Sequence, residues 1–220
     1  MSSTELIRAY LMERYTARRF LPLAAFLYVI GALATGGIPS MWRVIAGVGM
    51  AFTSMFALRV LDDTADLELD RRHHPGRVTV TAPSLRPLWV LAAVVFVVLL
   101  VRLAATDPHV DPALLLLGVG LALVAWYMIR TPLGAGPLLN AHVVHVKYPL
   151  IALVAGASGP IALQAPAVAL LSALYVGLCI REALDDPHIR GIRATRWVIG
   201  VELTLLAGLL LTLSTGGLQS

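Results

Sequence analysis

Residues 41–77 read MWRVIAGVGMAFTSMFALRVLDDTADLELDRRHHPGR, an apolar stretch that runs directly into a cluster of carboxylates. Positions 44–58 carry no charged side chain. A helix needs about 20 mainly apolar residues to cross a hydrocarbon core about 30 Å thick. We therefore expect a transmembrane helix over Met41–Val60, which brings the acidic residues that follow it to a membrane surface.

The composition of the whole chain is that of a membrane protein. Of its 220 residues, 58% are hydrophobic and 14% are charged, and the mean hydropathy is +0.81. A soluble domain has about 45–50% apolar and about 25% charged residues, so this class is excluded. The net charge of +4 gives no support to nucleic-acid binding until the position of the arginines is known. The single cysteine, Cys179, excludes an internal disulfide and a multi-cysteine metal site, and we expect it to serve packing.

Seven stretches are long and apolar enough to span a bilayer, which predicts an all-α polytopic bundle. The chain forms one transmembrane domain over residues 1–220, with an amphipathic cytoplasmic segment at 1–19 and cytoplasmic loops at 61–86 and 181–196. The expected spans are Phe20–Ile38, Met41–Val60, Pro87–Ala105, Pro112–Ile129, Leu138–Ala157, Gln164–Ile180 and Trp197–Leu213.

The basic residues predict the orientation of these spans, because cytoplasmic flanks attract Lys and Arg. Fourteen of the 17 basic residues fall on one side of the seven-span arrangement, and the loops near 36–40, 106–111 and 159–165 contain none. We expect the N-terminus in the cytoplasm and the C-terminus outside, in a bacterial-type cytoplasmic membrane. The fourteen are Arg8, Arg14, Arg18, Arg19, Arg59, Arg71, Arg72, Arg77, Arg86, Arg130, Arg181, Arg190, Arg193 and Arg196.

Eight of the 13 acidic residues form two clusters, one after the second expected span and one after the sixth. Asp62, Asp66 and Asp70 are spaced i, i+4, i+8, which places three carboxylates on one stripe of a helix that continues out of the second span. Carboxylates stacked in this way repel one another unless a cation lies among them. The clusters are Asp62, Asp63, Asp66, Glu68 and Asp70, and Glu182, Asp185 and Asp186.

Oxygen ligands favour a hard cation, and Mg²⁺ typically uses one or two carboxylates together with phosphate oxygens and water. The sequence thus predicts an Mg²⁺ site and a phosphate-ester substrate, which arginine side chains would also hold. The expected metal ligands are Asp62, Asp63, Asp66, Asp70, Glu182, Asp185 and Asp186. The expected anion-binding arginines are Arg59, Arg71, Arg72, Arg77, Arg181 and Arg190.

The segment from Arg59 to Arg77 resembles the first aspartate-rich motif of the UbiA-type intramembrane prenyltransferases, N/D-D-x-x-D-x-x-x-D followed by a basic loop. Asp62 takes the position that is most often Asn, and Asp63, Asp66 and Asp70 take the three Asp positions. Residues 182–186, Glu-Ala-Leu-Asp-Asp, are similar to the second motif of the family, with Glu in place of the first Asp. Both motifs follow even-numbered spans.

The resemblance implies an enzyme that binds a prenyl diphosphate through Mg²⁺ and ionises it, with the isoprenoid chain in an apolar cavity among the helices. Phe52, Phe56, Trp126 and Tyr127 are candidates for its walls, although ordinary helix packing is the favoured role for these aromatic residues. Most members of the family have about nine spans. The absence of a last helical pair leaves open an exposed cavity, a cavity completed in a homo-oligomer, or a specialised activity.

Several polar residues lie inside the expected spans. Lys147 and Tyr148 start the deeper part of the fifth span, and at 1.5 Å per residue Lys147 is close enough to the first acidic cluster to meet a diphosphate. Snorkelling to the headgroups is the alternative for Lys147. His142 and His145 are two metal-ligating types without a third, so interfacial hydrogen bonding is expected, and Glu202 is expected to pair with a neighbouring helix.

Three functions remain open from the sequence. The first is prenyl transfer from a diphosphate to an acceptor, and the second is cyclisation of the prenyl cation without an acceptor. The third is a non-catalytic transporter or lipid-binding scaffold, which would need no acidic stripe. For either enzyme we expect Asp62, Asp66 and Asp186 to be essential, with the lipid bilayer as the second partner besides the prenyl diphosphate.

Overall fold

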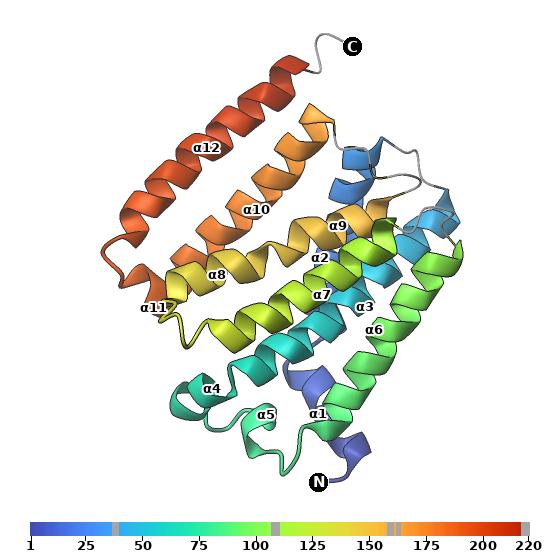
Figure 1. Cartoon of the computed structure of the whole chain (residues 1–220), viewed down its shortest axis with the longest axis vertical. Helices are drawn as coiled ribbons and strands as arrows, with labels where there is room; N and C mark the ends of the chain where they lie inside the picture. The colour runs from blue at the N-terminus through green and yellow to red at the C-terminus, as the bar shows by residue number, and fades with distance from the viewer. Residues whose placement is uncertain (37–39, 107–110, 158–160, 162–163, 217–220) are drawn as a thin grey trace.

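The computed structural model is a helical bundle, and it contains no strand within the residues it describes, namely 1–36, 40–106, 111–157, 161 and 164–216 (Figure 1). Side chains satisfy the first backbone N–H groups of the first and third helices. Ser2 and Glu5 form a capping box on the first helix, and Ser40 caps the third. The helices are α1 (Ser3–Glu13), α2 (Ala17–Thr35), α3 (Met41–Ala65), α4 (Leu67–His73), α5 (Val78–Thr81), α6 (Arg86–Thr106), α7 (Asp111–Ile129), α8 (Pro137–His145), α9 (Lys147–Gly156), α10 (Ala165–Asp185), α11 (Pro187–Arg190) and α12 (Thr195–Gly216).

Six segments of the described chain are long and apolar enough to cross a membrane: α2, α3, α6, α7, the pair α8 and α9, and α10. The predicted multi-pass membrane character is therefore confirmed. α12 covers the seventh expected span but is not among the six, so a seventh crossing stays a prediction.

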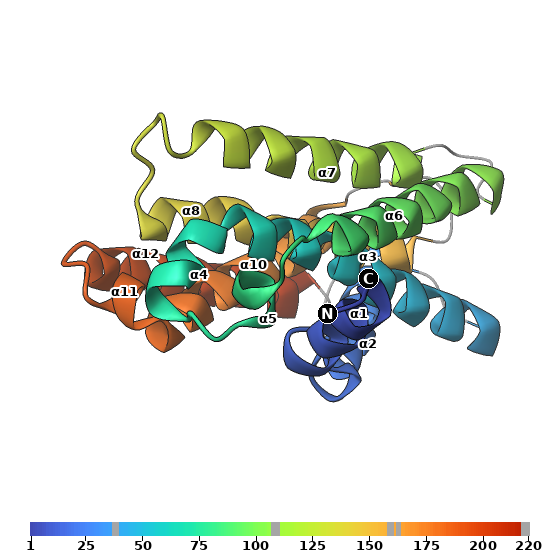
Figure 2. The same ribbon diagram turned by 90° about the horizontal axis from the view of Figure 1, so that it is seen from below.

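α3 lies at the centre of the bundle. α2 packs against α3 and α9, α3 packs against α6, and α10 packs against α12. Viewed from below, α7 lies on one side of α3, and α1 and α2 lie on the other (Figure 2). The N-terminus, α4 and α5 lie at the lower end of the bundle in Figure 1, and α11 lies at its left edge beside the start of α8. Both acidic clusters thus lie at one end, as expected. The loops expected on the opposite side, near 36–40, 106–111 and 159–165, contain no basic residues, and most of their positions lie outside the described residues.

The acidic residues of the first cluster do not share one helix, which corrects the prediction of a continuous stripe. α3 ends at Ala65 and α4 begins at Leu67, with Asp66 between them. The Thr64 hydroxyl donates a hydrogen bond to the Val60 carbonyl at 2.7 Å, a contact that bends helices. Arg130 donates to the Ala65 carbonyl at 2.7 Å and satisfies the end of α3. The break turns Asp70 away from the stripe.

The fifth expected span is also interrupted, between His145 and Lys147. Pro149 has no N–H group to bond the His145 carbonyl, and its ring crowds that carbonyl. The helix therefore ends as α8 and restarts as α9. This break puts Lys147 in the first turn of α9, where its side chain is buried at the centre of the bundle.

Candidate functional site

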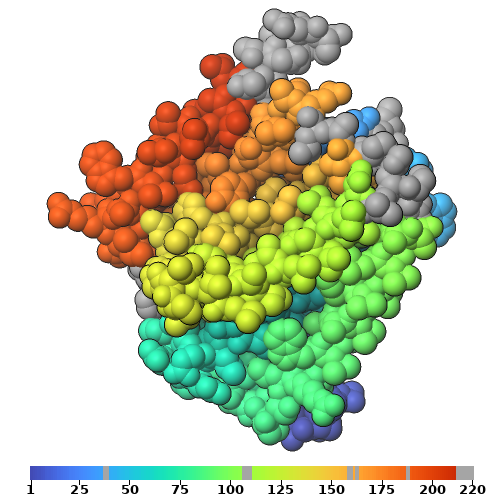
Figure 3. Space-filling model, in the orientation of Figure 1, coloured from blue at the N-terminus to red at the C-terminus, as the bar shows by residue number. Residues whose placement is uncertain are grey.

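A polar cavity of about 670 Å³ opens at the charged end of the bundle, and both acidic clusters contribute to its walls. The loop after α7 and the first turns of α8 close another side of it, and in Figure 3 this yellow-green surface lies next to the teal surface of α4. The acidic residues that line the cavity are Asp62, Asp66, Glu68, Glu182 and Asp186. The basic residues are Arg59, Arg72, Arg130, Lys147 and His145.

Asp62 is the deepest carboxylate of the cavity and is held on both oxygens. The Lys147 ammonium group donates to Oδ2, and the Tyr127 hydroxyl donates to Oδ1 at 2.6 Å. Lys147 is only 4% exposed, so its charge is withdrawn from the headgroup region. Lys147 therefore contacts the first acidic cluster and does not extend to the headgroups, while its role in binding a diphosphate stays a prediction.

Asp66 lies nearer the mouth of the cavity and forms an ion pair with Arg130 at 2.8 Å. Burial raises the pKa of the Asp66 carboxyl above its usual range, Arg130 opposes this shift, and the carboxylates of Asp62 and Asp70 add to it. Ionisation of the Asp66 carboxyl is thus less favourable at this position than it is in water. A cation placed beside it would stabilise that form.

Asp63 and Asp70 are not among the residues that line the cavity, and each is held by ion pairs with arginines. Asp63 accepts hydrogen bonds from the Tyr10 hydroxyl at 2.9 Å and from Arg14 at 2.6 Å, and it pairs with Arg59 at 3.1 Å. Burial is the main cause that raises the pKa of Tyr10, so this hydroxyl stays protonated and continues to donate. Asp70 pairs with Arg77. These two expected metal ligands are already occupied by arginines in the structure.

The second acidic cluster divides in the same way. Glu182 lines the cavity with its carboxylate 4.0 Å from His145, and Asp186 lines it from the end of α10. Asp185, in contrast, is exposed and pairs with Arg181 at 3.3 Å. Of the other residues expected to bind substrate, Arg59, Arg72 and Tyr148 line the cavity. Arg71, Arg77, Arg181 and Arg190 are not among its lining residues.

Three residues have functions in the site that the sequence does not predict. The sequence predicts Arg130 only as a mark of orientation and Tyr127 only as an aromatic wall, and it predicts no role for Asn140. Asn140 accepts hydrogen bonds from Arg130 at 3.1 Å and from the Trp126 indole at 2.9 Å, so it fixes the guanidinium against Asp66. A usable signal was present, because Arg130 ends the fourth expected span on the same side as both acidic clusters.

The charges of the cavity nearly cancel. Among the described residues that line it, five carboxylates face four permanently charged Lys and Arg side chains. Three of these cations are already paired with carboxylates of the cavity, Lys147 with Asp62, Arg130 with Asp66 and Arg72 with Glu68, and the fourth, Arg59, pairs with Asp63. The protein alone therefore offers little excess positive charge to an anion with several charges. It can hold such an anion if divalent cations bind with it.

Comparison of the chain with protein-family models, with curated protein sequences and with solved structures found no match.

Proposed function

We propose that this protein is an intramembrane enzyme similar to the UbiA-type prenyltransferases, which ionises a prenyl diphosphate and transfers the prenyl group to an acceptor. One observation carries the proposal. Two acidic segments more than a hundred residues apart in the chain meet on the walls of one cavity, together with Arg59, Arg72 and Lys147. A passive membrane scaffold has no use for this arrangement, because gathering carboxylates at a membrane surface costs free energy.

The lining residues fit the Mg²⁺ that the resemblance implies. Asp62, Asp66, Glu182 and Asp186 supply oxygen atoms from both sides of the cavity, and Mg²⁺ prefers oxygen donors. Burial raises the pKa of the Asp66 carboxyl despite its ion pair with Arg130, and a cation bound beside it would stabilise the ionised form. When bound, Mg²⁺ would neutralise the charge that develops on the departing diphosphate.

The basic side chains would bind and orient the diphosphate. Arg59 and Arg72 approach from α3 and α4, and a guanidinium group can hold phosphate oxygens with two parallel hydrogen bonds. Lys147 lies deepest, beside Asp62, where it would place a positive charge next to the bond that breaks. The Tyr127 hydroxyl, by donating to one oxygen of Asp62, would fix the orientation of that carboxylate.

An apolar cavity of about 370 Å³ adjoins the polar one between α3, α6 and α7. The two cavities share Ala65 and Tyr127, and Leu61, Trp89 and Val124 are among the other walls of the apolar one. We assign this space to the isoprenoid chain. A diphosphate in the polar cavity would then have its first allylic carbons beside the Tyr127 ring.

The test is incubation of the purified protein with geranyl, farnesyl and geranylgeranyl diphosphates, with Mg²⁺ or with EDTA, and with or without an aromatic or lipid acceptor. We expect diphosphate release that needs Mg²⁺ and an acceptor. Cyclic hydrocarbons or alcohols without an acceptor would instead identify a terpene cyclase. Failure to release diphosphate from all three substrates under every condition would refute prenyl diphosphate ionisation.

Two adjacent aspartates provide a matched pair of variants. Asp186→Asn removes a carboxylate from the cavity wall, so we expect diphosphate release to fall by at least about 100-fold, the scale on which loss of one electrostatic group lowers a rate. Asp185→Asn makes the same chemical change on an exposed side chain outside the cavity. Its rate should stay within a few-fold of the wild type. Equal losses in the two variants would contradict the site assigned here.

A further inference from the structure

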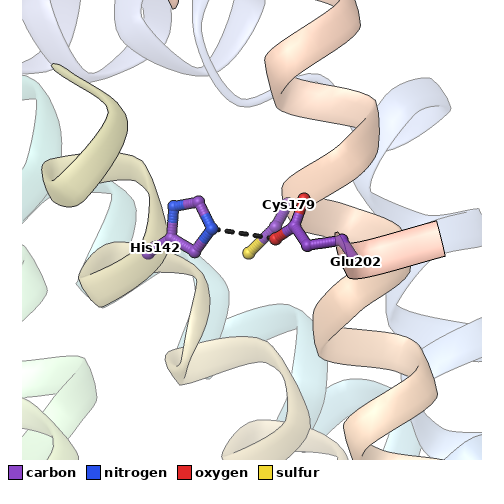
Figure 4. Close-up of side chains that lie close together, drawn as sticks. All are labelled: His142, Cys179 and Glu202. Carbon is purple, nitrogen blue, oxygen red and sulfur yellow. Dashed lines mark hydrogen bonds and ion pairs between the residues drawn. The ribbon is translucent and has the colours of Figure 1, made fainter. Parts of the chain in front are cut away.

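Close to the wall of the polar cavity, three side chains of different chemistry converge. His142 from α8, Cys179 from α10 and Glu202 from α12 bring a nitrogen, a sulfur and an oxygen atom within 4.8 Å of one another. Figure 4 shows the three side chains pointing toward one another from three helices. Cys179 is 1% exposed and Glu202 is 6% exposed, so the cluster lies inside the bundle.

The protonation of His142 is constrained by its backbone contact. Its Nδ1 lies 2.8 Å from the Leu138 carbonyl, which can only accept, so Nδ1 carries a hydrogen. Its Nε2 lies 2.8 Å from the Glu202 carboxylate, and this contact needs one more proton, on the imidazole or on the carboxyl group. A cation bound between Nε2 and the carboxylate would replace that proton. Donation of the second ring N–H to a backbone carbonyl is also how metal-ligating histidines are oriented.

Glu202 supplies an independent observation. Its second oxygen, Oε2, is buried and has no hydrogen-bond partner among the described residues. A buried carboxylate oxygen without a partner costs free energy, and a bound cation would remove that cost. The Glu202 carboxylate thus has unused ligand capacity beside the Cys179 thiol, whose hydrogen-bond neighbour is Tyr175.

We propose that His142, Cys179 and Glu202 form a binding site for a divalent transition metal, with Zn²⁺ as the ion that best fits the donor set. Zn²⁺ accepts nitrogen, sulfur and carboxylate oxygen together, whereas Mg²⁺ takes oxygen ligands. Binding displaces the thiol proton of Cys179 and the proton shared by His142 and Glu202. The site joins α8, α10 and α12, so the metal fixes the last helix to the bundle. It is separate from the Mg²⁺ site proposed for catalysis.

The experiment uses untagged protein purified in detergent, stripped of metal and titrated with Co²⁺. Because Cys179 is the only cysteine of the chain, a thiolate-to-cobalt charge-transfer band can arise only there. We expect this band to saturate at about one Co²⁺ per chain, to disappear on addition of Zn²⁺, and to persist in excess Mg²⁺. Absence of the band in the wild-type protein would overturn the proposal without reference to any variant.

Variants then assign the ligands. Cys179→Ser should abolish the charge-transfer band, and His142→Gln and Glu202→Gln should each weaken Zn²⁺ binding by more than about 100-fold, the largest loss seen when a residue that only orients a ligand is removed. His74→Gln, at an exposed histidine of the α4 end, is the matched control and should bind as the wild type does. Helix content measured by circular dichroism identifies any variant that fails to fold. Unchanged Zn²⁺ affinity in a folded Glu202→Gln variant would exclude Glu202 as a ligand.

Discussion

The ion pair between Lys147 and Asp62 stabilises the fold around the deepest part of the polar cavity. Both side chains are buried, and Asp62 has Tyr127 as its second partner. Lys147→Met would leave the Asp62 charge buried without its cation. We expect the free energy of unfolding to fall by about 3–5 kcal/mol, the cost of breaking a buried pair from one side. Thermal or denaturant unfolding in detergent measures this loss.

The double variant Asp62→Leu/Lys147→Met separates stability from function. Replacing both charges by apolar side chains removes the uncompensated charge, so most of the lost stability should return. Diphosphate release should not return, because the proposed mechanism needs both groups. A double variant that is as unstable as Lys147→Met would contradict the view that the unpaired charge of Asp62 causes the loss.

At the scale of helices, the contact between α2 and α9 is unusually close. A Cβ atom added at Gly31 would lie 1.7 Å from the Ala152 carbonyl oxygen, and one added at Gly156 would lie 2.1 Å from the Gly31 carbonyl carbon. Thr35 also donates a hydrogen bond to the Gly156 carbonyl at 2.9 Å. Small residues four apart on each helix permit this approach, as is common between membrane helices. The contact sets the position of α9, which carries Lys147 in its first turn.

Gly31→Ala and Gly156→Ala should therefore each destabilise the protein, by about 1–3 kcal/mol or more, because the two backbones must separate. Diphosphate release should fall as well, since α9 moves with Lys147. Gly177→Ala on α10 is the control, because an added Cβ there meets no atom within 4 Å. That variant should be as stable as the wild type or slightly more stable, since Ala favours helix. Thermal or denaturant unfolding curves of the three variants measure these differences, and Gly31→Ala and Gly156→Ala variants as stable as Gly177→Ala would contradict the prediction.

The helix α1 is tied to the end of α3 by the buried hydrogen bond from Tyr10 to Asp63. Tyr10→Phe removes this bond and leaves the ring in place, so docking of α1 should weaken by about 1.5–3 kcal/mol, as for hydrogen bonds to charged groups. Hydrogen exchange of the α1 amides should accelerate accordingly. Tyr28→Phe, in α2, should leave that exchange unchanged. Wild-type exchange rates in the Tyr10→Phe variant would show that Arg14 and packing alone hold α1.

Helix positions were predictable to within a few residues because a long apolar run has one stable form in a bilayer. The helix breaks at Asp66 and Val146 were not predictable. The first depends on side-chain contacts, and the second depends on a proline, which a count of apolar residues does not register. The sequence also did not predict which acidic residues of each cluster line the cavity and which lie outside it. Asp185 and Asp186 are neighbours in the sequence, and only the direction of each side chain from the end of α10 puts one in the cavity.

At the scale of the whole molecule, the charged end of the bundle is assembled from α1, α3, α4, α7, α8, α9 and α10. Clustering of carboxylates and arginines on one side of the spans predicted that these segments meet. Their pairing could not be predicted, because the partner of Asp66 is Arg130, which directly follows α7, and this contact depends on how α3 and α7 pack.

The path of α12 decides where the chain ends relative to the bilayer. α12 is 22 residues long, and its one carboxylate, Glu202, is buried against His142, as expected for an ionisable residue that faces the interior of a bundle. We therefore expect α12 to cross the membrane and place the end of the chain opposite the N-terminus. This expectation follows from the pairing of Glu202, since an interfacial helix would turn that carboxylate to water.

Labelling of introduced cysteines tests this topology, because the natural Cys179 is buried and should not react. In intact cells, a membrane-impermeant thiol reagent should reach Ser40→Cys, at the start of α3, but not Ser3→Cys, at the start of α1. Ser220→Cys should react as Ser40→Cys does if α12 crosses. Labelling of Ser3→Cys and Ser40→Cys from the same side would overturn α2 as a membrane span. A Ser220→Cys variant that behaves like Ser3→Cys would leave six spans and place α12 along the surface that carries the acidic cavity.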